Sequence, residues 1–314
     1  MFEFNYNAKS KELFVKLPDK IRFDCEFLDD ITELIAKCIG GTECVDTLFI
    51  SCNNGADYDK MSKAYLLNVL RFLMTYIKAK WNKDLSDQIT NVVSKKDGTK
   101  FTEIRIQDAI TNDNLIYYDF HGDKDVKRPV DEMANILVDK NLSINSETVK
   151  EFLSTTIGEI FSNSINHSDQ DEVFFMYDII FDGEDFYLCV NIVDYGTTIV
   201  ANVEKFFSDT TLEDIGSKKC IEWAIQSGNT TRKGSGGYGL PTLISYIYNT
   251  DGELYIFSGN AYYKLSEGKS NIEDAKGIFS GTSVTFKVKL YDTSRTIQYN
   301  KQNEELVSIR LDSI

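Results

Sequence analysis

The sequence predicts an α+β protein with a smaller N-terminal α/β domain and a C-terminal domain, and three observations lead to this expectation. The chain has 314 residues, too many for one ordinary core and suited to two domains of roughly 100–200 residues each. Apolar residues make up 42% and charged residues 26%, a balance typical of folded proteins. Helical and strand-like apolar patterns follow one another along the chain. We expect one domain at 1–128, a second at 129–292 and a tail at 293–314.

The charge and the cysteines exclude several classes of protein. The formal net charge of −15 argues against a nucleic-acid surface, because phosphate contacts require clustered Lys and Arg. The six cysteines include no CxxC pair and accompany only two histidines, so we expect no zinc-type cluster. The first twenty residues show no secretory signal. The most apolar stretch, 65–77, is interrupted by Asn68 and Arg71 and is shorter than the ~20 residues of a membrane span. These features predict a cytoplasmic protein without a membrane segment.

The N-terminal domain is expected to be a small α/β layer. Short apolar runs predict strands, and apolar residues that recur every three or four positions predict helices. Strands are expected at 45–50, 101–106 and 115–120. Helices are expected at 64–77 and around Leu28, Ile31, Ile35 and Cys38.

The C-terminal domain shows sharper patterns. Residues 283–290 alternate strictly between apolar and polar, which is typical of a strand with one buried face. Strands are expected at 173–181, 186–194 and 283–290. Helices are expected at 147–167, 212–226 and around Leu240, Leu243, Ile244 and Ile247.

The predicted helix 147–167 carries a polar stripe. Glu159, Asn163 and Asn166 stand at i, i+4 and i+7 and therefore share one side of the helix. Its apolar residues form a different stripe that should pack on a sheet. We therefore expect the polar stripe to face a cavity or solvent. The apolar stripe consists of Leu153, Ile157, Phe161 and Ile165.

A carboxylate ends the buried face of the second strand in this domain. Asp194 follows Leu188, Val190 and Ile192 on that face by period-two alternation. A buried carboxylate is costly unless something hydrogen-bonds it. Gly196, two residues later, allows a backbone to pass close to a ligand. The strand end is therefore a candidate binding position.

A glycine-rich loop directly precedes the helix around Leu240. Its glycines are Gly234, Gly236, Gly237 and Gly239. Backbone N–H groups at a helix start, together with the helix dipole, suit phosphate groups. The loop lacks the Gly-Lys-Ser/Thr of a Walker A motif. Gly281 and Thr282 lead into the last strand, where a hydroxyl is available to a base or an ordered water.

The order of these features resembles the GHKL superfamily of ATP-binding proteins, which includes gyrase-type topoisomerases, heat-shock chaperones, histidine kinases and mismatch-repair ATPases. The resemblance covers about residues 147–291. It implies a Bergerat fold, an α/β sandwich in which helices cover one face of a mixed sheet. The second motif departs from the family's Asp-x-Gly-x-Gly, because Thr198 replaces the last glycine. The matching motifs are Glu159 to His167, Asp194 to Gly196, Gly234 to Leu240, and Gly281-Thr282.

The resemblance implies a site for ATP and Mg²⁺. In it, Glu159 would be the general base, Asn163 the magnesium ligand and Asp194 the acceptor for the adenine amino group. The loop glycines would surround the phosphates, and Thr282 would support the adenine end of the pocket. The other ligand-contacting residues expected on this basis are Asn166, Gly196 and Leu240.

Two interpretations remain open for each of three basic residues near this site. Arg232 and Lys233 are either contacts to the β- or γ-phosphate or solvated residues of a lid at about 197–236. His167 is either a phosphate contact or a helix-surface residue. The only other histidine, His121, lies in a predicted strand-end turn and not in a dimerising helix, so we exclude a histidine kinase.

Three activities remain open for such a site. We expect an ATPase that uses hydrolysis to close its lid and to change conformation or association. One alternative is a serine/threonine protein kinase of the anti-sigma-factor type, and another is a module that ATP clamps without hydrolysis. The expected partners are ATP and either another protein or a second copy of the chain. The N-terminal domain would suit partner binding and is faintly similar to the sulfate-transporter/anti-sigma-antagonist type.

Overall fold

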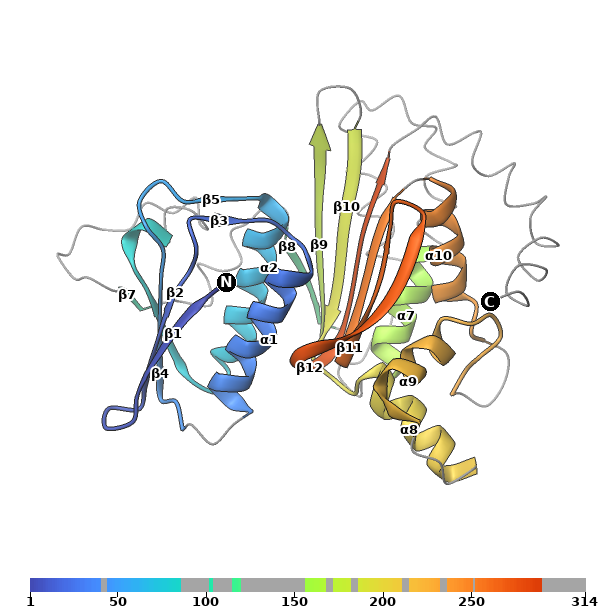
Figure 1. Ribbon diagram of the computed structural model, residues 1–314, viewed down its shortest axis with the longest axis horizontal. Helices are drawn as coiled ribbons and strands as arrows, with labels where there is room; N and C mark the ends of the chain where they lie inside the picture. The colour runs from blue at the N-terminus through green and yellow to red at the C-terminus, as the bar shows by residue number, and fades with distance from the viewer. Residues whose placement is uncertain are drawn as a thin grey trace. The chain divides into compact units, whose positions relative to one another are not determined.

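The computed structural model describes residues 1–40, 44–85, 102–103, 115–119, 156–167, 172–181, 186–210, 215–231, 236–250 and 252–289. The chain is a mixed α/β protein with several sheets, as the sequence predicts (Figure 1). The boundary expected at 128 and the tail expected at 293–314 lie outside the described residues. The chain divides into two compact units. The first comprises Met1–Tyr117, Phe174–Asp178 and Ala275–Phe279, and the second comprises Tyr118–Val173, Ile179–Asp274 and Ser280–Ile314.

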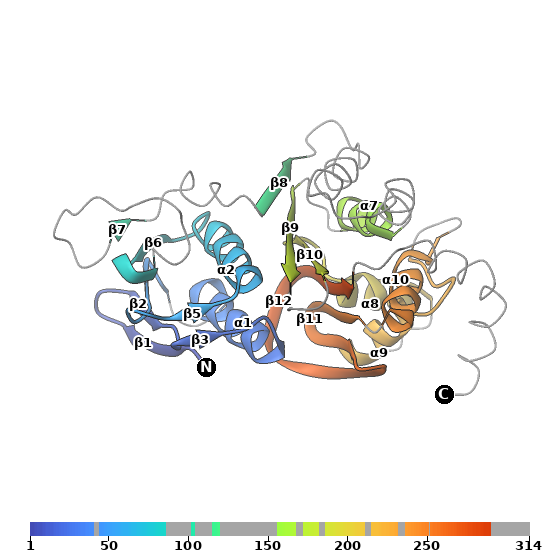
Figure 2. The same ribbon diagram turned by 90° about the horizontal axis from the view of Figure 1, so that it is seen from above.

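The first unit contains a five-stranded sheet and two helices. The strands are β1 (Glu3–Asn7), β2 (Glu12–Lys16), β4 (Thr47–Ser51), β6 (Lys78–Trp81) and β7 (Thr102–Glu103), in the order β1-β2-β4-β6-β7. Strands β2, β4 and β6 run parallel, whereas β1 and β7 pair antiparallel at the two edges. The helices α1 (Cys25–Ile39) and α2 (Lys60–Leu73) lie on the same side of this sheet (Figures 1 and 2). A short parallel pair, β3 (Lys20–Ile21) and β5 (Asp57–Tyr58), completes the unit.

Local sequence explains where these helices begin. Asp24 caps α1 by accepting a hydrogen bond from the Phe27 N–H at 2.9 Å. Asp59 caps α2 in the same way, with the Ser62 N–H at 2.8 Å. The helix predicted at 64–77 therefore begins earlier, at Lys60, and it ends at Leu73. The helix predicted around Leu28 and the strand predicted at 45–50 are confirmed as α1 and β4.

The second unit contains most of another five-stranded sheet. Its strands are β8 (Leu115–Asp119), β9 (Glu172–Phe181), β10 (Phe186–Asp194), β11 (Glu253–Ser266) and β12 (Lys269–Lys289), in the order β11-β12-β10-β9-β8. Strands β10 and β12 are antiparallel, and their register pairs Asp194 with Thr282. The helices are α7 (Gly158–His167), α8 (Ile199–Thr210), α9 (Gly216–Ala224) and α10 (Gly239–Asn249). Helix α7 packs against β10 and α10, and the other three helices pack against β11. All four lie on one side of the sheet (Figures 1 and 2).

Most predicted elements of this unit are confirmed where the structure describes them. The predicted apolar stripe of α7 is buried, with Ile157, Phe161 and Ile165 at most 3% exposed. Strands 173–181 and 186–194 match β9 and β10, and strand 283–290 is the end of the much longer β12. The sequence did not predict α8 or β11. No helix in the described ranges is long and apolar enough to cross a membrane.

Candidate functional site

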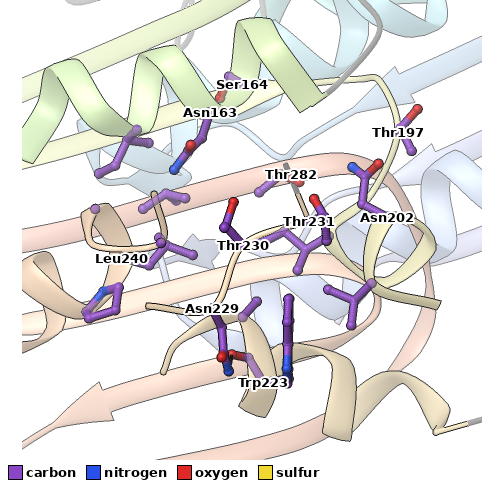
Figure 3. Close-up of a pocket in the computed structure, with 18 of the residues that line it drawn as sticks. Asn163, Ser164, Thr197, Asn202, Trp223, Asn229, Thr230, Thr231, Leu240 and Thr282 are labelled. Atoms are coloured by element: carbon purple, nitrogen blue, oxygen red, sulfur yellow. Dashed lines mark hydrogen bonds between the residues drawn. The ribbon is translucent and has the colours of Figure 1, made fainter. Parts of the chain in front are cut away.

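The second unit contains a cavity that opens to solvent between its helices and its sheet. Its walls come from α7, the end of β10, α8, α9, the segment 229–231, the start of α10 and β12 (Figure 3). The empty space is about 790 Å³, counted with the open mouth. Ligand pockets typically combine apolar walls with a few polar groups. The mixed lining of this cavity therefore suits a small organic ligand.

Residues from all four sequence motifs line this one cavity. Asn163 comes from α7, Asp194 from the end of β10 and Thr282 from β12. Gly237, Gly239 and Leu240 contribute from the glycine loop and the start of α10. The motifs are separated by tens of residues in the sequence, so the fold alone brings them together.

Asp194 is the only charged side chain among the described residues that line the cavity. Its side chain ends the buried face of β10 and is only 2% exposed. Burial raises the pKa of this carboxyl to about 7, although hydrogen bonds from the Gly196 N–H, the Ser164 hydroxyl and the Thr282 N–H act to lower it. The N–H of Gly196 lies 3.2 Å from Oδ1 of Asp194. The carboxylate is thus a strong acceptor that the protein's own donors do not fully compensate.

The backbone passes Asp194 so closely that only glycine fits at residue 281. Gly281 has φ +134, and a Cβ placed on it would lie 1.9 Å from the carbonyl oxygen of Asp194. A larger residue would push β12 away from β10 and so move Thr282. The close approach of the two strands therefore explains why residue 281, beside the end of β10, is a glycine.

Ser258, which the sequence analysis missed, fixes the same corner of the cavity. It is fully buried on β11. Its Oγ donates to the carbonyl oxygen of Gly281 at 2.8 Å, accepts from the Ile199 N–H at 2.8 Å and lies 3.0 Å from Oγ1 of Thr282. One hydroxyl thus ties the start of α8 to residues 281–282 of β12. A lone Ser within a buried apolar strand was the available signal.

The glycine loop is also held by tight backbone contacts. Gly237 has φ +82, and a Cβ on it would lie 2.2 Å from the carbonyl oxygen of Asn229. The Gly228 N–H donates to the Gly237 carbonyl at 3.0 Å, which closes the loop at its base. Helix α10 then begins at Gly239 without a side-chain cap. Tyr238, the N-cap residue, does not cap the first N–H groups of α10, which begin at the cavity-lining Gly239 and Leu240 and there suit an anion.

Glu159 stands beside this helix start. A Cβ on Gly239 would lie 2.9 Å from the Cβ of Glu159 and 3.5 Å from Nδ2 of Asn163. Gly239 therefore lets α10 approach the polar stripe of α7. The Glu159 side chain is exposed and is not part of the cavity lining.

The remaining predicted residues lie in different places. Asn166 does not line the cavity, because its position near the end of α7 lets Nδ2 donate to the Ser162 carbonyl of its own helix at 2.7 Å. Gly196 contributes its N–H to Asp194. His167 is the last residue of α7. Gly236 stands at the base of the loop, where a Cβ on it would lie 3.4 Å from Oγ1 of Thr230. The residues outside the described ranges are Arg232, Lys233 and Gly234.

Residues from the described part of the segment predicted as a lid, 197–236, line one wall of the cavity. Helix α8 is held by the Ile199–Ser258 hydrogen bond, and a Cβ on Gly259 would lie 3.1 Å from Val200. Helix α9 is joined to β12 by an ion pair of 2.9 Å between Lys218 and Asp274. The sequence predicted one helix in this segment, whereas the structure has two.

Two comparisons of the chain with known proteins assign no function to this cavity. A scan of the chain against protein-family models found no match. A search of the curated proteins also found no match.

Proposed function

We propose that this chain is a magnesium-dependent ATP-binding protein of the GHKL type, with a Bergerat-fold domain over about residues 147–291. The observation that carries the proposal is the cavity itself. A buried carboxylate, an uncapped helix start behind a glycine loop, and Asn163 line the same space. The resemblance of the four motifs to the family was independent of this geometry.

The acid at the cavity wall favours adenine over guanine. The adenine N6 amino group is a hydrogen-bond donor, whereas guanine presents the O6 acceptor at the equivalent ring position. The Asp194 carboxylate accepts hydrogen bonds and, when ionised, cannot donate one. At a pH above about 7, where Asp194 is ionised, a guanine O6 would therefore leave two buried acceptors facing each other, which is costly.

The start of α10 offers hydrogen-bond donors, and we propose that it binds the phosphates. Backbone N–H groups and the positive end of the helix dipole attract them. Among the described residues that line the cavity there is no Lys, Arg or His, and a bound Mg²⁺ would balance part of the phosphate charge. The described residues contain no cluster of three or more His, Cys, Asp or Glu. Mg²⁺ commonly takes most of its ligands from phosphates and water, and the Asn163 amide oxygen would supply one protein ligand.

ATP hydrolysis is the reaction we propose for this site. Glu159 precedes Asn163 by one helical turn and lies at the loop that would hold the phosphates. There it would accept a proton from the attacking water, and such general-base help is typically worth about 10²–10⁴ in rate. Phosphorylation of a protein hydroxyl and ATP binding without turnover remain the two alternatives. The cytoplasmic location also remains a prediction.

Calorimetry tests binding, and labelled ATP tests the reaction. ATP should bind in the presence of Mg²⁺, more weakly with EDTA, and GTP should bind more weakly than ATP. Asn163→Ala should lose the magnesium dependence. An absence of ATP binding at millimolar concentration would refute the proposed function.

With γ-labelled ATP, hydrolysis gives free phosphate, a protein kinase gives labelled protein, and a clamp gives neither. Glu159→Gln should bind ATP with unchanged affinity and lose turnover by about 10²–10⁴. Glu222→Gln, which changes an exposed carboxylate on α9, is the matched control and should behave as wild type. Equal turnover in Glu159→Gln and wild type would sink the assignment of the base.

A further inference from the structure

Helix α9 places an aromatic ring on a wall of the cavity that none of the four motifs supplies. Trp223 lines the cavity from α9. Figure 3 shows it on the opposite side from Asn163 and Ser164, with Thr230, Thr231 and Thr282 between. Its ring packs against Phe206 and Phe207 of α8, with ring centroids 5.3 and 5.7 Å apart. These two contacts hold the indole in one orientation, so it is available to a ligand without rearrangement.

The wall that carries Trp223 is firmly attached to the second unit. Cys220 and Ile221, on the same helix, are fully buried. The Trp223 carbonyl accepts a hydrogen bond of 2.8 Å from Nδ2 of Asn229, which lies at the base of the glycine loop. Trp223 is therefore connected both to the buried side of α9 and to the base of the glycine loop.

The chemistry of this wall matches a ring and not a phosphate. Helices α8 and α9 also contribute Ile199, Val203 and Ala224 to the cavity lining, all apolar, together with the polar Asn202. This wall carries no charged group, and a flat purine ring or the apolar face of a sugar gains contact area and stacking there. The donors that suit phosphate stand instead at α10.

We propose that the indole of Trp223 contacts the nucleoside half of the bound nucleotide and so determines affinity for purine nucleosides. This inference rests on the proposed ATP site. It adds to that site a contact from α9, a helix outside all four motifs. Loss of a base–aromatic contact typically weakens binding roughly ten- to hundred-fold, and the same loss is expected for adenosine and for ATP.

Intrinsic fluorescence provides a direct test, because the chain has only two tryptophans. The other one, Trp81, is buried on β6 in the first unit. The emission of wild type minus that of Trp223→Phe therefore reports Trp223. Adenosine and Mg-ATP should change this difference, and inorganic triphosphate with Mg²⁺ should not.

Affinity measurements by calorimetry complete the test. Trp223→Ala should bind adenosine and ATP roughly ten- to hundred-fold more weakly, and Trp223→Phe should recover most of the affinity. Tyr248→Ala removes an exposed aromatic ring from α10, away from the cavity, and should bind as wild type. Circular dichroism checks that each variant is folded. The fluorescence test does not depend on the Ala variant, because it compares wild type only with Trp223→Phe.

The outcomes separate this inference from the proposed function. If wild type binds ATP and Trp223→Ala binds it equally well, the nucleoside contact is wrong and the ATP site stands. A fluorescence response to triphosphate but not to adenosine also overturns the contact, because it places the indole at the phosphates. If wild type binds no ATP, the proposed function and this inference fail together.

Discussion

Replacing Asp194 with Asn should change how the stability of the protein depends on pH. Burial raises the pKa of this carboxyl from 3.8 to about 7 in the folded protein. The folded state therefore holds the proton more tightly than the unfolded state does. The stabilisation by the protonated carboxyl is fully present below pH 3.8, falls as the pH rises, and is lost above about pH 7. At about 1.4 kcal/mol per pH unit, the loss amounts to about 4 kcal/mol.

Urea unfolding of wild type and Asp194→Asn between about pH 4 and pH 8 measures this loss. The chain has 49 Asp and Glu residues, so the pH dependence of either protein alone contains many contributions. The difference between the two proteins isolates residue 194 because the amide does not titrate. We expect the variant to gain about 4 kcal/mol relative to wild type as the pH rises through this range.

The control for this experiment is Glu222→Gln, which changes an exposed carboxylate in the same unit. Its stability should follow that of wild type at every pH. Parallel stability curves for wild type and Asp194→Asn would refute the reasoning, because they would mean that the carboxyl is not desolvated in the folded protein. A gain already complete at pH 5 would contradict the pKa of about 7.

Two further substitutions test how the cavity is held. Gly237→Ala should weaken ATP binding at least tenfold by calorimetry, because its Cβ would overlap the Asn229 carbonyl at 2.2 Å. Gly228→Ala, with φ +83 but no atom within 4 Å of the added Cβ, is the control, and an equal effect of both would point to backbone strain alone. Ser258→Ala should cost about 1–3 kcal/mol in urea unfolding, because the Ile199 N–H loses its buried acceptor. It should also speed hydrogen exchange at that amide, and unchanged exchange would show that Ser258 does not hold α8.

Local patterns were sufficient for the elements that carry the motifs. The alternation that ends at Asp194 correctly grouped the carboxylate with buried residues of β10, because strand periodicity is a local property. The sequence did not show that the other face of β10, with Asn191 and Val193, is buried as well. The helical spacing from Glu159 to Asn163 placed both on one side of α7 for the same reason. Asn166 lies on the same side of the helix by its spacing, but it is near the end of α7 and bonds to Ser162 of its own helix. The spacing predicts the side of the helix and not whether a residue lies level with the cavity.

The part of the cavity formed by α8 and fixed by Ser258 of β11 was not predicted, because its contacts are long-range. Ser258 joins residues 59 positions before it and 24 after it, and no local pattern encodes such a pairing. Helix α8 has apolar residues at helical spacing, including Val203 and Phe206, but it falls in a segment that the resemblance assigns to a lid. The family expectation therefore masked a local signal. The position of the Trp223 ring depends on its contacts with Phe206 and Phe207 of α8, which no local pattern encodes.

Several features of the second unit that lower its stability lie at or beside the cavity. Asp194 is buried at a cost that its hydrogen bonds do not cancel, and Gly281 and Gly237 occupy conformations that other residues rarely adopt. By contrast, structure alone explains the carboxylate of Asp59 in the first unit. It caps α2 and also accepts a hydrogen bond from the Phe23 N–H at 2.8 Å. The donors around residue 194 explain why an acceptor stands there, but they leave the pKa of the carboxyl raised to about 7. A ligand donor such as the proposed adenine amino group would offset this remaining cost of burial.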